Sequence, residues 1–337
     1  MGISAPDERL VILIPIFNDW ESAQLLLNDL DQALASHQAA QLLLNDLDQA
    51  LASHQAAQIL LIDDGSSTPI PEGFARNFQN ISDVKILALR RNLGHQRAIA
   101  VGLVFVYENM PCRAVVVMDG DGEDRPSDIA ALLREFDANS GASIIFAARA
   151  KRLERPLFRF LYHVYRGIHW LLTGDSVRVG NFSIVPFETL SKLVVTSEIW
   201  YHYAAAVIRS RLQFRTIPLA RGKRLRGRSK MNFIGLLLHG LSAFFVYGDI
   251  VGARLLVAIA LLFVSGVVLA SAGLAVQFTR GATFFIAGSL GIVLMLAILI
   301  ALVLVFTVIG SRVNMGFLPL RDCPYFVNGV RRIYPVE

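Results

Sequence analysis

The stretch VVVMDGDGEDRPSD, residues 115–128, contains the residues whose types and spacing are best suited to chemistry. Asp119, Asp121, Glu123 and Asp124 fall within six positions, directly after a run of apolar residues typical of a strand. Side chains two apart in extended backbone point the same way, so the carboxylates of Asp119 and Asp121 are expected to converge on one cation. Such oxygen ligands suit Mg²⁺ or Mn²⁺, with Glu123 as a third or water-mediated ligand. Taken alone, the motif also fits a solvated acidic turn.

A cluster of positive charge follows in RGKRLRGRSK, residues 221–230, which holds six cations in ten residues. Such a cluster suits the binding of a phosphate monoester. Its second pKa of about 6 leaves the phosphate largely a dianion at neutral pH, so it needs counter-charges rather than a general base. Part of the cluster also fits contact with anionic lipid.

A second cationic element is expected after residue 148. Arg149 follows an apolar run, and Pro156 then opens a predicted helix over 156–172, in which Arg159, His163 and Arg166 share one face. This aromatic-rich helix is expected either to lie at lipid headgroups or to pack its aromatic side chains on the core.

The elements that must position these residues are short apolar runs at 10–17, 58–64, 84–89, 114–119 and 143–148, which alternate with longer helix-like stretches. Their continuous apolarity predicts strands buried on both faces, and hence an α/β fold with a largely parallel sheet flanked by helices. Ligands of such sheets collect beyond the carboxyl ends of the strands, where FND, DDGSS and DGDGED all fall.

The C-terminal third is apolar enough to predict a membrane anchor. Mean hydropathy is +0.50, and residues 255–278 and 281–310 carry no charge, each run exceeding the roughly 20 residues that cross a bilayer. We expect two transmembrane helices joined by a turn around Arg280, with a buried hairpin of a soluble core as the alternative. Residues 233–248 are expected to form an interfacial helix or, alternatively, a core helix.

The flanking charges predict the topology. Arginine and lysine stand on both sides of the apolar region and only Arg280 lies between its halves, so both termini and the sheet domain are expected to be cytoplasmic. No signal peptide is recognised at the start. The two cysteines have neither metal-ligand nor disulfide spacing, which suits a reducing compartment.

One segment is duplicated: AQLLLNDLDQALASHQA occurs at 23–39 and again, unchanged, at 40–56. An insertion of 17 residues rotates a continuing helix to about 100° short of whole turns, so both copies cannot point their leucines at the sheet. We therefore expect a bend or an extra helical excursion between them. The expected domains are a sheet domain at 1–230, an interfacial segment at 231–253, two transmembrane helices within 254–311 and a tail at 312–337.

The segments VILIPIFND, LLIDDGSS, RRNLGHQRAIAVGL, MDGDGED and RLRGRSK follow one another in an order and spacing that resembles the family 2 glycosyltransferases with the GT-A fold. Within that family the chain is similar to the branch of dolichol-phosphate mannose synthase and bacterial polyprenyl-phosphate glycosyltransferases. The resemblance covers nearly the whole chain, because this bacterial branch often carries two C-terminal membrane helices and a tail like RDCPYFV.

The resemblance implies roles for individual residues. The nucleotide-sugar donor would be held by Pro15, Phe17, Asp19, Leu61, Asp63, Asp64, Asn92, Gly94 and Gly120, although Asp64 also fits a role in capping its turn. Asp119 and Asp121 would hold the metal and act in catalysis with Arg149, while Glu123 stands where relatives often have Gln. The acceptor and diphosphate would contact Arg149, Arg159, Arg224, Ser229 and Lys230, of which Arg224, Ser229 and Lys230 match an R-x-x-G-x-S-K pattern.

One departure concerns the segment VGNFSIV, where relatives commonly read G-D-F-R-L. Asn181 and Ser183 stand in place of an acid and an arginine, so Asn181 cannot act as a base. This fits a phosphate nucleophile that needs none.

The expected function is inverting, metal-dependent transfer of a sugar from a UDP- or GDP-sugar to a polyprenyl phosphate at the cytoplasmic membrane face. Its partners would be the donor, the lipid acceptor and membrane lipids, without nucleic acid; a homo-oligomer is left open. A glycosyltransferase for another membrane-associated acceptor and an inactive scaffold subunit with this fold are the alternatives. A processive synthase would show a Q-x-x-R-W motif, and a nucleotidyltransferase a glycine-rich N-terminal loop, and neither appears in the sequence.

Overall fold

A computed structural model describes residues 9–44, 57–149, 156–175, 179–226, 233–275, 282–311 and 317–335. The chain divides into two compact units. The first comprises Met1–Leu153, Val177–Leu236 and Phe317–Glu337, and the second comprises Glu154–Ser176 and Leu237–Gly316. In this division residues 154–176 group with the apolar helices, whereas residues 231–236 and 317–337 group with the sheet.

The first unit is built on an eight-stranded sheet, counted over the described residues, with the order β7-β5-β6-β4-β1-β2-β3-β8. The pairs β1–β2, β1–β4, β2–β3 and β5–β7 are parallel, whereas β6 runs antiparallel to β4 and β5, and β8 antiparallel to β3. The strands are β1 (Leu10–Ile16), β2 (Ala57–Asp63), β3 (Ile81–Leu89), β4 (Ala114–Val117), β5 (Ile144–Arg149), β6 (Ser183–Pro186), β7 (Phe214–Leu219) and β8 (Val327–Tyr334).

The predicted strands correspond to β1 through β5, and the expected mostly parallel α/β sheet is confirmed. Strand β1 shows why its apolarity is continuous. Val11 and Leu13 belong to one buried cluster and Ile12 and Ile14 to another, and all four are completely inaccessible to solvent. Each face of the sheet is therefore covered, and alternate side chains of a strand enter different cores.

Helices supply these covers. The first cluster contains side chains of α3 (His95–Asn109), α6 (Phe187–Leu193) and α7 (Tyr203–Arg209), and the second contains side chains of α1 (Trp20–Leu44) and α4 (Ile129–Ala138). The short helix α11 (Pro319–Asp322) leads into the last strand.

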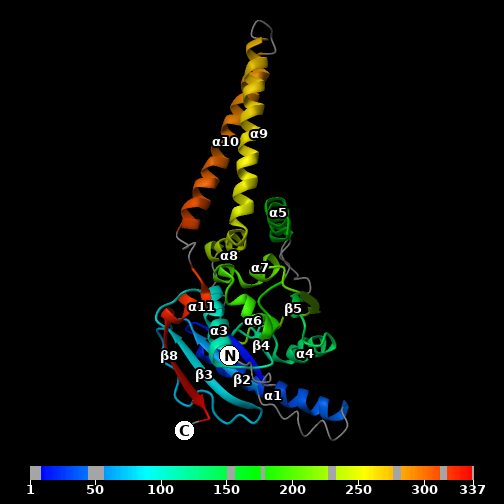
Figure 1. Ribbon diagram of the computed structural model, residues 1–337, viewed down its shortest axis with the longest axis vertical. Helices are drawn as coiled ribbons and strands as arrows, with labels where there is room; N and C mark the ends of the chain where they lie inside the picture. Colours follow the sequence, from blue (N-terminus) through cyan, green and yellow to red (C-terminus); the bar gives the residue numbers. More distant parts are fainter. Residues whose placement is uncertain are drawn as a thin grey trace. The chain divides into compact units, whose positions relative to one another are not determined.

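Strand β8 was not expected, because residues 312–337 were predicted to be a tail. It pairs with β3 at one edge of the sheet (Figure 1). Its arginine Arg332 donates to Asp83 at 2.9 Å, and the Tyr334 hydroxyl donates to the carbonyl oxygen of Phe78 at 2.6 Å. The C-terminal segment is therefore a structural part of the first unit.

The structure describes the first copy of the duplicated segment and the first five residues of the second. Helix α1 continues through the junction at residues 39 and 40 and ends at Leu44, so no interruption separates the two copies there. Leu26, Leu27 and Leu30 of the first copy are fully buried in the core. Residues 45–56 of the second copy lie outside the described residues.

The second unit contains α5 (Pro156–Thr173), α8 (Phe233–Val246) from Leu237 onward, α9 (Gly248–Ala275) and α10 (Ala282–Ser311). The helices predicted at 156–172 and 233–248 are present. Phe244 of α8 packs against the His169 ring of α5, and the Tyr165 hydroxyl donates to the carbonyl oxygen of Gly240 at 3.0 Å. Helix α5 also exposes apolar side chains, among them Trp170 and Leu171.

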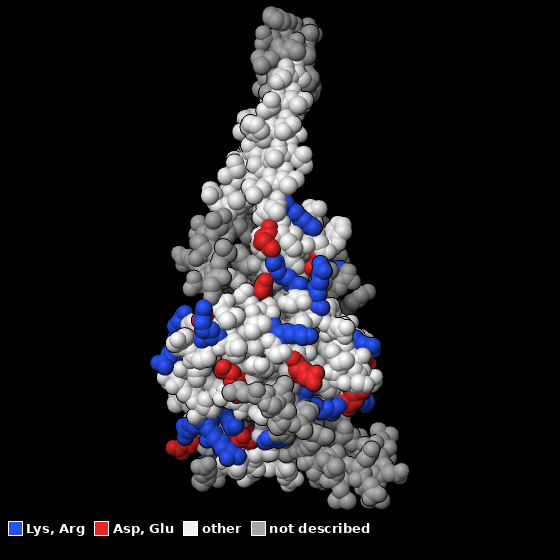
Figure 2. Space-filling view, viewed as in Figure 1, with Lys and Arg blue, Asp and Glu red and all other residues white. Residues whose placement is uncertain are grey.

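Helices α9 and α10 pack against one another along their length. Among the described residues one segment, Gly248–Leu269 of α9, is long and apolar enough to cross a membrane, and Gly288–Leu304 of α10 is a shorter apolar helix. In Figure 2 the visible face of this pair is white, without acidic or basic side chains, along most of its length. The described residues therefore include one helix with the length and composition of a membrane span, and the second span of the expected hairpin stays a prediction.

Candidate functional site

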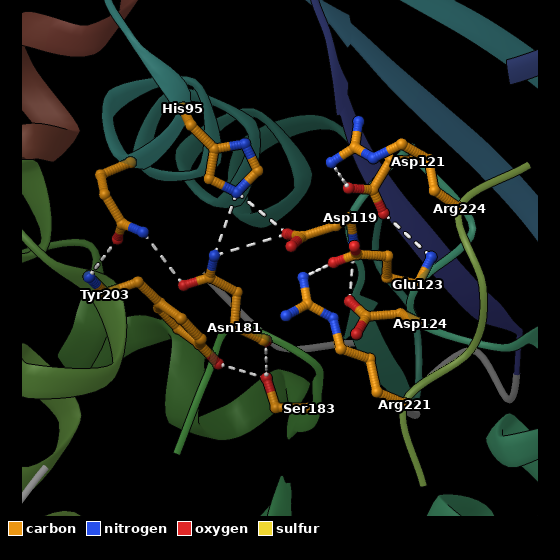
Figure 3. A network of polar contacts seen from close by, with 11 residues as sticks. His95, Asp119, Asp121, Glu123, Asp124, Asn181, Ser183, Tyr203, Arg221 and Arg224 are labelled. Atoms are coloured by element: carbon orange, nitrogen blue, oxygen red, sulfur yellow. Dashed lines mark hydrogen bonds and ion pairs between the residues drawn. The ribbon is translucent and has the colours of Figure 1, made fainter. Parts of the chain in front are cut away.

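The acidic loop, residues 119–124, follows β4 at the carboxyl ends of the parallel strands (Figure 3). One oxygen of Asp124 accepts the backbone N–H of Asp119 at 2.9 Å, and one oxygen of Asp121 accepts the backbone N–H of Glu123 at 2.9 Å. Asp124 is almost completely buried. Its carboxylate therefore holds the loop in shape, while Asp119 and Asp121 stand where a ligand can reach them.

The basic segment, residues 221–226, follows β7 and lies on the acidic loop. A guanidinium N–H of Arg224 donates to Asp121 at 2.6 Å, and Arg221 forms an ion pair with Glu123. The backbones are joined as well, because Gly222 N–H donates to Glu123 at 2.8 Å and Leu225 N–H donates to Asp121 at 3.0 Å. The repulsion among the clustered carboxylates is thus offset by arginines of the same chain.

Gly122 allows this close approach. Its φ of +81° lies in the left-handed region, and a Cβ atom there would come within 2.3 Å of the Leu225 side chain. The residue therefore has to be glycine for two independent reasons, backbone conformation and space.

His95 and Asn181 face the acidic loop from the other side. His95 Nε2 lies 3.0 Å from Asp119 Oδ1, and the Asn181 amide nitrogen lies 3.0 Å from His95 Nε2 and 3.4 Å from Asp119 Oδ1. Burial is the largest influence on the pKa of His95 and lowers it. The charge and hydrogen bond of Asp119, together with Asp121 and Asp124, outweigh burial, so the pKa of His95 is raised overall.

Asp64 holds the neighbouring turn. Its two carboxylate oxygens accept the backbone N–H groups of Leu93 at 2.7 Å and Gly94 at 2.9 Å. Burial raises the pKa of the Asp64 carboxyl, and the two backbone bonds partly oppose this rise. The sequence left two roles open for Asp64, donor binding and capping of the turn, and these two hydrogen bonds support capping.

Replacing Asp64 by asparagine is expected to destabilise the protein by about 1–3 kcal/mol, because the amide offers one acceptor oxygen and leaves one buried N–H group facing an NH₂ group. Thermal unfolding measures the change. Asp137→Asn, at an exposed residue paired with Arg113, is the matched control and is expected to unfold like the parent. Equal unfolding of both variants would contradict the role of Asp64.

The structure places the predicted donor residues as follows. Pro15, Phe17 and Asp19 lie at or just after the end of β1, Asp63 ends β2, Asn92 and Gly94 follow β3, and Gly120 belongs to the acidic loop. They lie at or just beyond the carboxyl ends of the parallel strands, which is the placement expected from the sequence. Leu61 requires a correction: it is fully buried in the core, so its side chain offers no surface to a nucleotide.

Several predicted acceptor residues cannot be placed. Ser229 and Lys230 lie outside the described residues, and the side chains of Arg149 in β5 and Arg159 in α5 are not described either. Their roles stay predictions.

Sequence reasoning missed three residues at the site: His95, Gln96 and Tyr203. The first two follow Gly94 in the quoted segment RRNLGHQRA, which was a signal for them, whereas Tyr203 stands in a stretch without a recognisable motif. Arg221 was counted only as part of the basic cluster.

The donor set can be compared with the needs of a divalent ion. Asp119 and Asp121 supply hard oxygen atoms of the kind that Mg²⁺ and Mn²⁺ prefer. Both carboxylates are engaged by groups of the chain, and no group of three metal-binding side chains is assembled among the residues that the structure describes. The residues therefore fit a metal by their chemistry, although Arg224 occupies one oxygen of Asp121 in this structure.

Several known proteins resemble parts of this chain. Part of the chain, 76 residues, is 34% identical to the uncharacterized glycosyltransferase YkcC of Bacillus subtilis (strain 168), and the match covers 23% of this chain and 22% of YkcC. The solved structure of glucosyl-3-phosphoglycerate synthase from Mycobacterium tuberculosis in complex with Mn²⁺, UDP-glucose and phosphoglyceric acid is 12% identical, with a TM-score of 0.44, and the match covers 73% of this chain and 80% of that chain.

A CMP:2-keto-3-deoxy-manno-octonic acid synthetase complexed with CTP is also 12% identical, with a TM-score of 0.38, over 70% of this chain and 98% of that chain. These structural likenesses are weak. The decisive comparison is the family model described as glycosyl transferase family 2, which matches residues 11–194, more than half of the chain, from the second residue of β1 to beyond β6. The chain therefore belongs to glycosyl transferase family 2.

Proposed function

We propose that this protein transfers a sugar, with inversion, from a UDP- or GDP-sugar to the phosphate of a polyprenyl carrier, in a reaction that depends on Mg²⁺ or Mn²⁺. The observation that carries the proposal is the ion-paired contact of the acidic loop with the basic segment. Here Asp121 and Arg224 lie 2.6 Å apart, in the loops that follow β4 and β7. One pair of oppositely charged segments can thus serve both a diphosphate with its metal and a phosphate acceptor.

The acidic side of the site suits the leaving group. Asp119 and Asp121 would hold the divalent ion, which when bound neutralises the negative charge that a nucleoside diphosphate carries away. Asp124 keeps the backbone of Asp119 in place through the 2.9 Å hydrogen bond. The loop therefore presents its two ligands from a fixed backbone.

The basic side suits the acceptor. Once Arg224 is released from Asp121, its guanidinium can bind a phosphate oxygen, and Arg221 can do the same after leaving Glu123. A phosphate nucleophile is already ionised at neutral pH, so no side chain has to remove a proton. Asn181, which cannot act as a base, is consistent with such an acceptor.

The apolar helices support a lipid acceptor. Leu256 and Leu261 of α9 and Leu290 and Leu294 of α10 are each at least 60% exposed, a surface expected to contact lipid rather than water. We propose that α9 and α10 form the two-helix anchor, with the sheet domain and both termini in the cytoplasm. The exposed Trp170 and Leu171 of α5 support a place for that helix at the headgroups.

The experiment is incubation of the purified full chain in lipid nanodiscs with undecaprenyl phosphate, Mg²⁺ or Mn²⁺ and labelled UDP- and GDP-sugars in turn. We expect a labelled glycolipid with one donor, and no product in excess chelator. Absence of product from every donor, or undiminished turnover in chelator, would contradict the proposal.

The second candidate is an inactive scaffold, which Asn181 in place of the usual acid favours. A scaffold is expected to bind neither UDP nor GDP in a metal-dependent way. Calorimetric titration of both nucleotides with and without Mn²⁺ therefore separates the two functions. Nucleotide binding without lipid product would favour a transferase for another membrane-associated acceptor.

A further inference from the structure

The position of Asn181 follows from strand pairing. Strand β6 lies antiparallel to β4 with Val117 opposite Ser183. Because the strands are antiparallel, moving two residues forward from Val117 corresponds to moving two residues back from Ser183. Asp119 and Asn181 therefore come side by side at the end of the pair. Asn181 therefore stands next to a predicted metal ligand although 62 residues separate them.

The direction of the Asn181 amide is set by a chain of hydrogen bonds (Figure 3). The backbone N–H of Tyr203 donates to Gln96 Oε1 at 2.7 Å. This bond leaves the Gln96 amide nitrogen to donate to Asn181 Oδ1 at 3.1 Å. Because a backbone N–H can only donate, Asn181 must present its NH₂ group, rather than its oxygen, to Asp119.

The backbone of Asn181 is held by the same tyrosine. The Tyr203 hydroxyl lies 2.8 Å from Ser183 Oγ, and Ser183 Oγ in turn donates to the Asn181 carbonyl oxygen at 2.8 Å. Tyr203 and Ser183 are fully buried, and Gln96 and Asn181 are nearly so. Water is therefore a poor substitute for any of these partners, and the arrangement resists rotation of the amide.

We infer that Asn181 is a positioning residue that holds the Asp119 carboxylate by donating to it, and that Gln96 and Tyr203 fix the direction of this donation. The inference rests on the proposed function in that Asp119 is taken to serve the donor. In this inference Asn181 and Ser183, which stand where relatives commonly have an acid and an arginine, form a neutral pair that Tyr203 holds in place. An acid at position 181 would place a second negative charge 3.4 Å from Asp119 Oδ1, where Asn181 now donates.

Two nearly isosteric variants test the inference. In Gln96→Glu the carboxylate still accepts from Tyr203 but cannot donate, so Asn181 is expected to turn and present its oxygen to Asp119. Asn181→Asp keeps the acceptor for Gln96, removes the donor and adds a negative charge beside Asp119. Each is expected to lower kcat about tenfold or more, with the KM for polyprenyl phosphate unchanged within about twofold.

Gln24→Glu is the matched control. Gln24 also accepts a backbone N–H, from Ala75 at 2.8 Å, and donates to an asparagine, Asn28, at 3.1 Å, but it lies on α1. The chemical change is identical, and full activity is expected. If both test variants keep the parent kcat, or if Asn181→Asp raises it, the inference is overturned.

A measurement without substrate separates this inference from the proposed function. The double variant Gln96→Glu with Asn181→Asp places two carboxylates at the 3.1 Å contact, so its melting temperature is expected to fall further than the sum of the single changes. Additive changes would overturn the hydrogen-bonded chain. If the parent protein is inactive with every donor, the proposed function fails. The hydrogen bonds from Tyr203 through Gln96 to Asn181 are tested separately, by the melting temperatures of the two single variants and the double variant.

Discussion

Changing both Asp119 and Asp121 to alanine is expected to lower sugar transfer at least about 10³-fold, because the charge on the departing diphosphate then has no metal site to neutralise it. The initial rate with the best nucleotide sugar measures the loss. Mn²⁺-dependent binding of the free nucleotide should disappear in the same variant, which separates loss of donor binding from loss of the lipid acceptor.

The control for this variant is Asp137→Ala, an exposed carboxylate on α4 that pairs with Arg113. It should keep the parent rate. Since the double change also frees Arg224 and His95 from their partners, the variant's thermal unfolding must be recorded beside its rate. Turnover at the parent level in a folded protein would refute the role of the acidic loop.

Arg224→Ala is expected to have effects of opposite sign on metal binding and on turnover. Removing the guanidinium frees the Asp121 oxygen that accepts from it at 2.6 Å, so Mn²⁺ should bind roughly tenfold more tightly. Turnover should nevertheless fall about 100-fold, because a phosphate acceptor loses its charged partner. Titration with Mn²⁺ and the rate at saturating metal measure the two effects.

Arg215→Ala is the matched control, since Arg215 is an exposed arginine on β7 that pairs with Glu135 at 3.3 Å. Neither quantity should change in it. If Arg224→Ala weakens metal binding together with turnover, the arginine supports the acidic loop and does not exchange with the metal.

The predictable part of the fold is the part whose strands are buried on both faces. Continuous apolar runs predict strands β1 to β5, and the long uncharged runs at 255–278 and 281–310 predict the helices α9 and α10. Strand β6 has only four residues, and β8 is an edge strand that is mostly exposed and carries two arginines. Neither has a periodic apolar pattern, so tertiary pairing rather than local sequence defines them.

The site shows the same division. The sequence alone predicted that Asp119 and Asp121 lie close together, because the two residues are only two positions apart in one loop. Asn181 was recognised as a departure from the family pattern, but its place beside Asp119 depends on the register between β4 and β6. The engagement of Arg221 and Arg224 with the acidic loop likewise depends on backbone contacts between segments about 100 residues apart, which no local pattern encodes.

The pairing of β3 with β8 restricts how the chain can cross a bilayer. These strands precede and follow the apolar helices, yet they share one sheet. An odd number of crossings between them would leave Val327–Tyr334 and Ile81–Leu89 in different aqueous compartments, where they could not hydrogen-bond. The number of membrane crossings between β3 and β8 must therefore be even. If α9 crosses the membrane, α10 must cross it in the opposite direction.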